Sequence, residues 1–205
     1  MNTYDIFESV RKFEREIADY CGAKYGVAVS SCSSAIFLCC EYLKVKDVYI
    51  PKKNYPSVPC SIIHAGGRVN WTDKKWEGCY QLKPYPIYDS AIRFKRDMYI
   101  KDSYYCLSFQ YWKHIPIGRG GMILTDDKKS VEWFERARFD GRGKASRHKD
   151  YIDMLGWNIY MTPEQASRGL FLFNTIKDKN LPDIKVDYVD LSQFSVYTEG
   201  NEEKV

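Results

Sequence analysis

The sequence predicts an α/β fold in three layers, with helices on both faces of a mostly parallel mixed sheet. Short apolar runs alternate along the chain with segments whose apolar residues recur every three or four positions, which is the pattern of alternating strands and helices. Hydrophobic residues make up 44% of the 205 residues, so the chain can bury a core of its own. No apolar run reaches about 18 residues, so we expect no membrane-spanning helix.

The order of these segments gives the expected elements. The first helix is expected over residues 6–20, because Gly22 follows its last apolar residue and suits a helix end. Thr162–Gln165 marks the start of another helix, since Thr caps it, Pro suits its first turn and Gln completes a capping box. Further helices are expected over residues 35–43 and 130–139, with a short one from residue 57. The strands are expected at residues 27–29, 48–50, 68–71, 85–88, 104–109 and 120–125.

Charge and cysteine content narrow the function classes. Lys and Arg total 31 and Asp and Glu total 27, so the net charge of +4 is smaller than expected of a dedicated nucleic-acid-binding protein. The seven cysteines are odd in number and lack Cys-x-x-Cys spacing. This pattern argues against a disulfide framework or a structural zinc site and favours free thiols in a reducing cytoplasm. Charges throughout the first twenty residues predict that there is no secretory signal.

Polar side chains follow several of the expected strands. Ser31–Ser34, Tyr55, Asp89, Ser108 and Lys113 lie at or just beyond strand ends, where open α/β sheets bind their ligands. Serines that open a helix offer free N–H groups and the helix dipole to an anion such as phosphate. Pyridoxal phosphate (PLP) needs an amine for its aldehyde, a carboxylate for its ring nitrogen and donors for its phosphate. These polar residues therefore form a set that PLP chemistry can use.

Five segments resemble the DegT/StrS family of PLP-dependent sugar aminotransferases, which have the fold-type-I aspartate-aminotransferase architecture. Phe13–Tyr25 resembles the family's first helix and glycine turn, and Val29–Ile36 resembles its phosphate loop. Tyr88–Ala91 resembles its Asp-Ala-Ala segment, and Ser108–Asp126 the block that carries its Schiff-base lysine. Gly156–Ala166 resembles its Gly-x-Asn-x-Arg-Met segment. The five segments follow the family's order, which makes the resemblance fairly specific.

The resemblance implies roles for individual residues. Lys113 would be the catalytic residue, which bonds to the cofactor aldehyde and moves the proton between the substrate and cofactor carbons. Asp89 would bind the pyridine nitrogen, and Tyr55 would stack on the ring. Asn158 would reach the phosphate of the neighbouring subunit, because family members form homodimers with shared active sites. The serines that would bind the phosphate are Ser31, Ser33 and Ser108.

The implied reaction moves an amino group from glutamate or glutamine to a nucleotide-linked keto-sugar. Arg142, Lys144 and Arg147 lie in a polar, basic stretch at residues 140–150 and could attract the nucleotide diphosphate. No metal, nucleic-acid or membrane partner is expected.

Each of these residues also has a purely structural interpretation. A lysine is most often a solvated surface charge, an aspartate at a strand end is often a turn or helix cap, and serines before a helix often only cap it. Four positions depart from the family pattern. Cys32 replaces a glycine, Ile92 a Gln or His, Arg119 an acidic residue and Tyr160 an arginine.

Three alternatives to the aminotransferase remain. A non-catalytic relative acting as an interaction subunit is favoured by Ile92 and Tyr160 and opposed by Lys113 and Asp89. A PLP-dependent sugar dehydratase of the same superfamily would carry His at the position of Lys113. A nucleic-acid binder would rest only on the net charge and the basic stretch at residues 140–150.

The chain is expected to divide into a trimmed PLP-binding large domain, residues 1–176, and a short carboxyl-terminal extension, residues 177–205. Family members continue into a smaller domain that closes over the substrate, so this domain is expected to be missing here or reduced. Alternating residues at 184–188 and 194–197 could pair as a small hairpin, and residues 200–205 are expected to fray.

Overall fold

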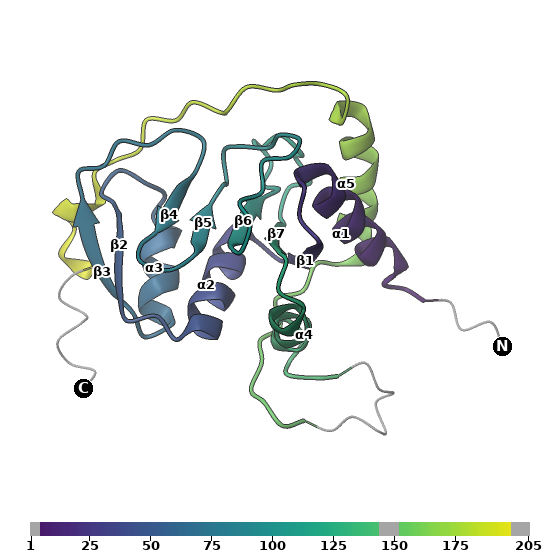
Figure 1. Cartoon of the computed structure of the whole chain (residues 1–205), viewed down its shortest axis with the longest axis horizontal. Helices are drawn as coiled ribbons and strands as arrows, with labels where there is room; N and C mark the ends of the chain where they lie inside the picture. The colour runs from purple at the N-terminus through teal and green to yellow at the C-terminus, as the bar shows by residue number, and fades with distance from the viewer. Residues whose placement is uncertain (1–4, 144–151, 198–205) are drawn as a thin grey trace.

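The computed structural model describes residues 5–143 and 152–197, which form an α/β fold (Figure 1). The helices are α1 (Glu8–Cys21), α2 (Cys32–Leu43), α3 (Ser57–His64), α4 (Lys128–Ala137) and α5 (Pro163–Ile176). The strands are β1 (Tyr25–Val29), β2 (Asp47–Pro51), β3 (Arg68–Thr72), β4 (Tyr80–Leu82), β5 (Ile87–Asp89), β6 (Tyr104–Ser108) and β7 (Gly121–Thr125). Two 3₁₀ helices follow, η1 (Leu191–Gln193) and η2 (Ser195–Tyr197).

Five strands form one mixed sheet in the order β1-β7-β6-β5-β4, and β2 pairs with β3 beside it. Tyr49 of β2 and Lys83, just after β4, exchange both backbone hydrogen bonds at 2.7 and 3.1 Å and so join the two sheets. The predicted α/β class and mixed sheet are confirmed, but the parallel majority is not. Among the described strands, β1/β7, β6/β7 and β4/β5 pair antiparallel, and only β5/β6 and β2/β3 pair parallel.

The connections explain these directions. A parallel neighbour requires a crossover that returns the chain to the starting edge, and this crossover is usually a helix. Residues 109–120, which join β6 to β7, contain no helix, so β7 runs back along β6. The same loop carries Lys113 and brings it beside the end of β6.

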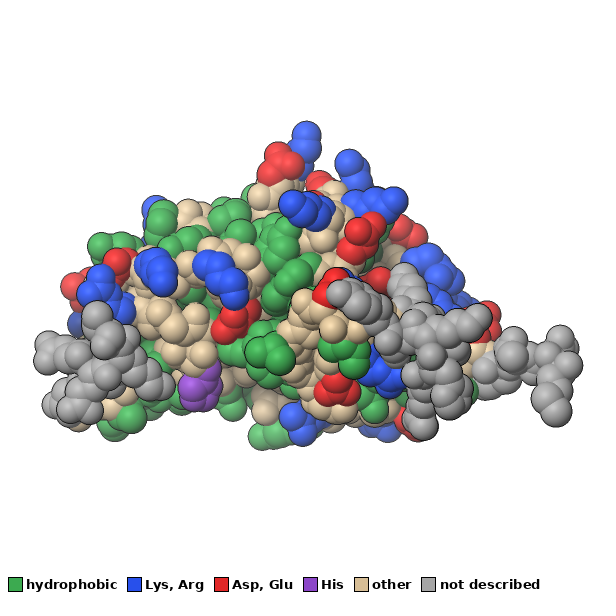
Figure 2. Space-filling model, turned by 90° about the horizontal axis from the view of Figure 1, so that it is seen from below, with side chains coloured by type: hydrophobic (Ala, Val, Ile, Leu, Met, Phe, Trp, Pro, Cys, Tyr) green, Lys and Arg blue, Asp and Glu red, His purple; other side chains and the backbone are tan. Residues whose placement is uncertain are grey.

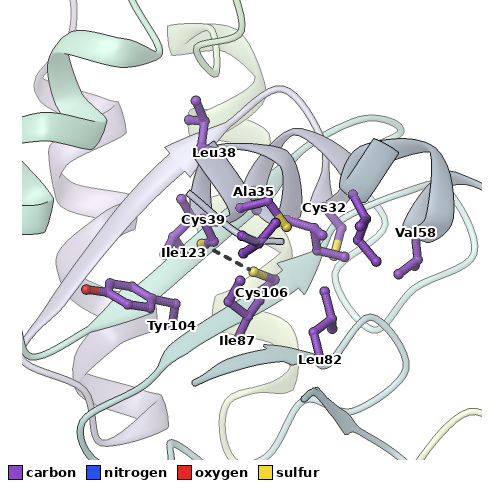
Figure 3. Packing of buried hydrophobic residues seen from close by; sticks show 14 of the residues in the cluster. Cys32, Ala35, Leu38, Cys39, Val58, Leu82, Ile87, Tyr104, Cys106 and Ile123 are labelled. Carbon is purple, nitrogen blue, oxygen red and sulfur yellow. Dashed lines mark hydrogen bonds between the residues drawn. The ribbon is translucent and has the colours of Figure 1, made fainter. Parts of the chain in front are cut away.

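Side chains alternate between the two faces of the sheet and bury a hydrophobic cluster on each. Val27 and Ile123 pack with α2, α3 and α4 on one face, while Ala28 packs with α1 and α5 on the other. Figure 3 shows part of the first cluster, where the Sγ atoms of Cys39 in α2 and Cys106 in β6 lie 3.9 Å apart. This arrangement confirms the predicted three layers.

Local sequence signals set several helix ends. α1 ends at Gly22, whose φ of 84° lies in the left-handed region that favours glycine. The Ser31 hydroxyl caps α2 by accepting a hydrogen bond from the Ser34 N–H at 3.0 Å. At the start of α5, Thr162 and Gln165 form the predicted capping box, with bonds of 2.9 and 3.3 Å.

The chain after α5 does not form the expected hairpin. Residues 178–189 contain no strand, and η1 and η2 occupy the segment expected to pair with residues 184–188. The backbone bonds elsewhere instead, because Ile184 N–H donates to Ile92 O at 2.9 Å and Leu191 N–H donates to Lys52 O at 2.8 Å. These two bonds hold the segment of residues 182–190 near its two ends, and we call this segment the strap. The predicted frayed tail at residues 200–205 lies outside the described residues.

The described surface bears on two expectations. None of the helices in residues 5–143 and 152–197 is long and apolar enough to cross a membrane. On the face in Figure 2, basic and acidic side chains are interspersed among hydrophobic ones. A nucleic-acid-binding surface presents a basic patch or stripe instead. This face therefore gives the nucleic-acid alternative no support.

Candidate active site

A cavity of about 280 Å³ lies where β1, β5 and β6 end and where α2 and α3 begin. Ligands of α/β sheets bind at edges of this kind. Its lining comes from segments far apart in the sequence: Ser31, Cys32, Ser33, Ile36, Tyr55, Ser57, Val58, Asp89, Ala91, Ser108, Gln110, Lys113, Gly118, Arg119, Gly120 and Tyr188.

Lys113 brings a buried amine into this cavity. The residue is 8% exposed, and its Nζ lies 3.2 Å from the centre of the Trp112 ring. Within the described part of the chain, no hydrogen-bond acceptor or carboxylate pairs with this Nζ. Burial lowers the pKa of Lys113 to about 8, although the neighbouring Cys32 and Asp89 act in the opposite direction. More of this amine is therefore neutral near pH 7 than in an exposed lysine.

Asp89 places an oriented carboxyl group in the same cavity, at the end of β5. It is 5% exposed, and one oxygen accepts a hydrogen bond from the Ala91 N–H at 3.0 Å. The other oxygen accepts a hydrogen bond from the Tyr80 hydroxyl at 3.1 Å. Burial raises the pKa of Asp89, while these hydrogen bonds and the Lys113 charge act in the opposite direction. The hydrogen bonds fix the direction in which the carboxyl group faces.

The amino ends of two helices meet at the cavity wall. Ser31 and Ser33 stand at the start of α2, and Ser57 opens α3. The Ser33 and Ser57 hydroxyls hydrogen-bond to each other at 2.6 Å and so tie the two helix starts together. Helix amino ends present N–H groups and a positive dipole, so this wall suits an anion such as phosphate.

The serine loop fits closely against β7. A Cβ added to Gly121 would lie 2.3 Å from the carbonyl carbon of Ser31, so only glycine allows this approach. Gly118 faces the open cavity with a φ of 113°. Gly121 therefore lets β7 approach the serine loop closely, and Gly118 leaves space free in the cavity.

The donor set of the cavity fits PLP. Lys113 supplies an amine without a hydrogen-bond or carboxylate partner in the described residues, Asp89 supplies an oriented carboxyl group, and the starts of α2 and α3 supply donors for a phosphate. These are the three groups that the cofactor requires of a protein.

The structure brings six of the predicted site residues together. The residues that line the one cavity are Ser31, Ser33, Tyr55, Asp89, Ser108 and Lys113. Ser31 also spends its hydroxyl on capping α2, which agrees with the structural interpretation of that residue. Their proposed contacts with a cofactor stay predictions.

The other predicted residues lie elsewhere. Asn158 is exposed and donates a hydrogen bond to Asp140 at 3.2 Å, outside this cavity. Arg142 lines a second hollow of about 900 Å³ and lies over the Phe139 ring at 5.4 Å. Lys144 and Arg147 lie outside the described residues.

Several lining or supporting residues were missed from the sequence. Ser57 carried the same signal as Ser31, a serine opening a helix, and could have been found. Tyr80 lies on a strand of three residues, too short to show a pattern. Tyr188 follows no strand end and gave no signal. Arg119, noted only as a departure from the family pattern, also lines the cavity.

Comparisons with known proteins point to one family. Residues 2–87 and 100–181 match the model of the DegT/DnrJ/EryC1/StrS aminotransferase family. The chain is 23% identical over 226 residues to the spore coat polysaccharide biosynthesis protein SpsC of Bacillus subtilis (strain 168). This match covers 82% of the chain and 57% of SpsC.

Two solved structures share the fold. AtS13 from Actinomadura melliaura matches with a TM-score of 0.72 and 18% identity, over 83% of this chain and 60% of AtS13. The sugar aminotransferase CalS13 from Micromonospora echinospora matches with a TM-score of 0.72 and 13% identity, over 84% of this chain and 61% of CalS13.

The chain spans about three-fifths of the length of these relatives. The matched residues include the cavity-lining residues from Ser31 to Val58 and from Ser108 to Gly120, whereas Asp89, Ala91 and Tyr188 lie outside the matched ranges. Aminotransferases of this family use PLP, whose requirements the cavity meets. The chain belongs to the DegT/DnrJ/EryC1/StrS aminotransferase family.

Proposed function

We propose that this chain binds PLP in the cavity around Lys113 and transfers an amino group from glutamate or glutamine to a nucleotide-linked keto-sugar. One observation carries the proposal. The buried amine of Lys113 shares a cavity with the Asp89 carboxyl group and with the amino ends of α2 and α3. An unpaired buried lysine is costly for a fold, so a role in binding or chemistry explains it better than a structural one.

Lys113 would serve as both nucleophile and proton carrier. When bound, PLP supplies an electron sink for the bond broken at the substrate carbon. With a pKa of about 8, Lys113 is partly neutral near pH 7–8, so its amine can attack an aldehyde. The same amine can accept a proton and return it, because its pKa lies close to the working pH.

The other cavity residues would hold and orient the cofactor. Asp89 would accept a hydrogen bond from the protonated ring nitrogen, since Ala91 and Tyr80 keep its carboxyl group in one orientation. Ser33, Ser108 and the N–H groups at the start of α2 would bind the phosphate. Tyr55, partly exposed at the cavity, would stack on the ring.

Two features support the substrate and the assembly in this proposal. SpsC is named for polysaccharide biosynthesis and CalS13 is described as a sugar aminotransferase, which supports a sugar acceptor. Asn158 lies outside the cavity of its own chain, so the contact with the cofactor phosphate that the family resemblance implies would be made to a second copy in a homodimer. Arg142, at the second hollow, would attract the nucleotide diphosphate. The seven cysteines are free thiols, which supports a reducing compartment such as the cytoplasm.

A non-catalytic interaction subunit is the second candidate. Ile92 has an apolar side chain at a position where the family pattern has a Gln or His. This residue is 6% exposed, and its carbonyl accepts a hydrogen bond from the strap. This change would remove a polar contact with the cofactor ring, which favours a site that binds PLP without efficient turnover.

Reduction of the PLP complex tests both candidates. The protein would be mixed with PLP, reduced with borohydride and digested, and mass spectrometry would locate the label. We expect a yellow complex and a label on Lys113, which Lys113→Ala abolishes and the exposed-surface control Lys101→Ala retains. A label spread over surface lysines would contradict the proposal. Added glutamate should convert the unreduced cofactor to its amine form, and labelling without conversion would favour the interaction subunit.

A further inference from the structure

The strap, residues 182–190, passes beside the cavity. In Figure 1 the yellow-green segment runs from α5 along the upper edge of the strands to β3. Its first end is fixed near Lys113, because His114 Nε2 lies 2.9 Å from Pro182 O. Asp183 pairs there with Arg93 at 2.7 Å and with Lys95 at 3.1 Å.

The other end is fixed near β2. Asp190 pairs with Lys52 at 3.3 Å, and Leu191 N–H donates to Lys52 O at 2.8 Å. Asp187 pairs with Lys53 at 3.4 Å. Because both ends are fixed, the residues between them have a defined place above the cavity.

Tyr188 is the strap residue that lines the cavity. Its neighbours face outward: the Asp187 side chain is 95% exposed and Val189 is 58% exposed, whereas Tyr188 is partly buried. The Tyr188 ring stacks on Trp76 at 5.7 Å with 20° between the ring planes. Trp76 packs in turn on Tyr80 at 4.5 Å.

These contacts connect Tyr188 to the floor of the cavity, the name we give to Tyr80, Asp89 and Lys113. Tyr80 holds Asp89, so the aromatic series from Tyr188 through Trp76 ends at the carboxyl group proposed to bind the cofactor. Burial raises the pKa of Tyr188, and the neighbouring Asp89 and Cys32 act in the same direction. Its phenol is therefore neutral at neutral pH and presents a ring face and one O–H group to the cavity.

The cavity is small, so the position of the Tyr188 ring affects how much of it a ligand can use. Pockets for drug-sized ligands measure about 300–1,000 Å³. The cavity, at about 280 Å³, therefore has little room for a second molecule once one small ligand is bound. An acceptor must approach Lys113 past the residues that surround the remaining opening.

We propose that Tyr188 is a specificity-determining residue, whose ring on the strap limits which acceptors reach the amine of Lys113. The inference rests on the proposed function for the identity of the acceptor, but the access it describes depends only on the positions of Tyr188 and Lys113. The ring therefore slows the approach of bulky carbonyl compounds more than that of small ones.

Reductive labelling of Lys113 tests this access in the protein without PLP. Formaldehyde and naphthaldehyde, each with cyanoborohydride, serve as the small and the bulky reagent, and peptide mass spectrometry gives the labelling rate at Lys113. Tyr188→Ala should speed naphthaldehyde labelling by about tenfold and formaldehyde labelling by less than about twofold, because the ring slows mainly the bulky reagent. Val189→Ala, a change at the adjacent outward-facing position, should leave both rates unchanged.

Two more variants keep the test decisive if Tyr188→Ala misfolds, which circular dichroism would report. Tyr188→Trp should slow naphthaldehyde labelling below the wild-type rate, and Tyr188→Phe should match the wild type, because the ring and not the hydroxyl excludes the reagent. Equal naphthaldehyde rates in wild type, Tyr188→Ala and Tyr188→Trp would overturn the inference. An equal gain in Val189→Ala would also overturn it.

The outcomes separate this inference from the proposed function. If wild-type protein binds no PLP but Tyr188→Ala speeds naphthaldehyde labelling, the proposed function fails and the access role of Tyr188 stands. If PLP labels Lys113 but substitutions at Tyr188 change no rate, the proposed function stands and the inference fails. In the PLP-loaded protein, Tyr188→Ala should accept bulkier keto compounds than the wild type does.

Discussion

The floor of the cavity and the strap above it are held in different ways. Asp89, Tyr80 and Lys113 in the floor are buried, and the first two are joined by a hydrogen bond of 3.1 Å. The strap is held by backbone hydrogen bonds at its two ends and by ion pairs, the most exposed of which joins Lys53 and Asp187, with side chains 60% and 95% exposed. Leaving a buried polar group unpaired costs about 1–3 kcal/mol, whereas an exposed ion pair contributes about 0–1 kcal/mol.

This difference assigns different tasks to the two regions. Changes in the floor should alter stability and cofactor binding together, because the same buried contacts serve both. Changes in the strap should alter access to the cavity and leave the stability of the fold almost unchanged. Substitutions at Gly121, Lys113 and Asp183, and changes of pH and salt, can break or sharpen this comparison.

The largest effect is expected at Gly121 of β7, which packs against the serine loop of the cavity. A Cβ at this position would lie 2.3 Å from Ser31 C and 2.4 Å from Cys32 N, and both are backbone atoms that cannot rotate away. Gly121→Ala should therefore lower the free energy of unfolding by about 3 kcal/mol, and the displaced serine loop should weaken PLP binding. Urea unfolding and PLP titration measure the two effects.

Gly118→Ala is the matched control for this substitution. Gly118 has a φ of 113° but nothing within 4 Å of an added Cβ, so only backbone strain of about 1–3 kcal/mol is expected. Gly121→Ala should also weaken PLP binding more than Gly118→Ala does. A smaller cost at Gly121 than at Gly118 would show that the contact between β7 and the serine loop is loose.

The next effect is the pH dependence of the rate at which formaldehyde labels Lys113. With a pKa of about 8, its rate of labelling by formaldehyde should rise about tenfold per pH unit up to pH 8 and then level off. The labelling rate of an exposed lysine such as Lys101 should continue to rise towards about pH 10. Rates at both lysines, measured in one digest between pH 6 and 10, check this expectation, and parallel profiles would show that the amine is solvated.

The same shift makes Lys113 unfavourable for stability at neutral pH. Its pKa is lower in the folded state than the ordinary value of 10.5, so the folded state binds its proton more weakly. The cost is fully present below pH 8 and disappears as the pH rises towards 10.5. Lys113→Met should therefore raise the free energy of unfolding at pH 7 by about 1–2 kcal/mol, after a discount for water at the cavity.

The sequence predicted the residues at the cavity well, because the rule that places polar residues at the ends of strands needs only the local sequence. Ser31, Asp89 and Ser108 each follow an apolar run, and the carboxyl ends of strands on one sheet edge form a ligand site whatever the direction of the remaining strands. The cavity therefore formed as expected although the parallel majority of the sheet did not. The strand directions depended on residues 109–120, whose length alone did not reveal the absence of a helix.

The strap could not be predicted in the same way. Its place is set by Asp183 and Arg93, which are 90 residues apart in the sequence, and by the anchor at Lys52. The apolar alternation of residues 184–188 also suits a strand, so the hairpin was the simplest local interpretation. Only the tertiary fold shows that Tyr188 faces the cavity.

The smallest effect on stability is expected where the strap is anchored. Asp183→Asn keeps the shape of the side chain but removes its charge from Arg93 and Lys95. The free energy of unfolding should fall by less than about 1 kcal/mol, because these groups are partly exposed and water replaces the partner. Naphthaldehyde labelling of Lys113 should nevertheless rise about twofold to fivefold, since the strap end nearest Lys113 is loosened.

Salt distinguishes this anchor from a packing effect. In 1 M NaCl the Debye length falls to about 3 Å, so the wild-type strap should loosen and its naphthaldehyde rate should approach that of Asp183→Asn. Tyr188→Ala should show little salt dependence, because its wall is already absent. If Asp183→Asn instead destabilises the fold as strongly as Gly121→Ala, then floor and strap form one cooperative unit, and the division of tasks between them does not hold.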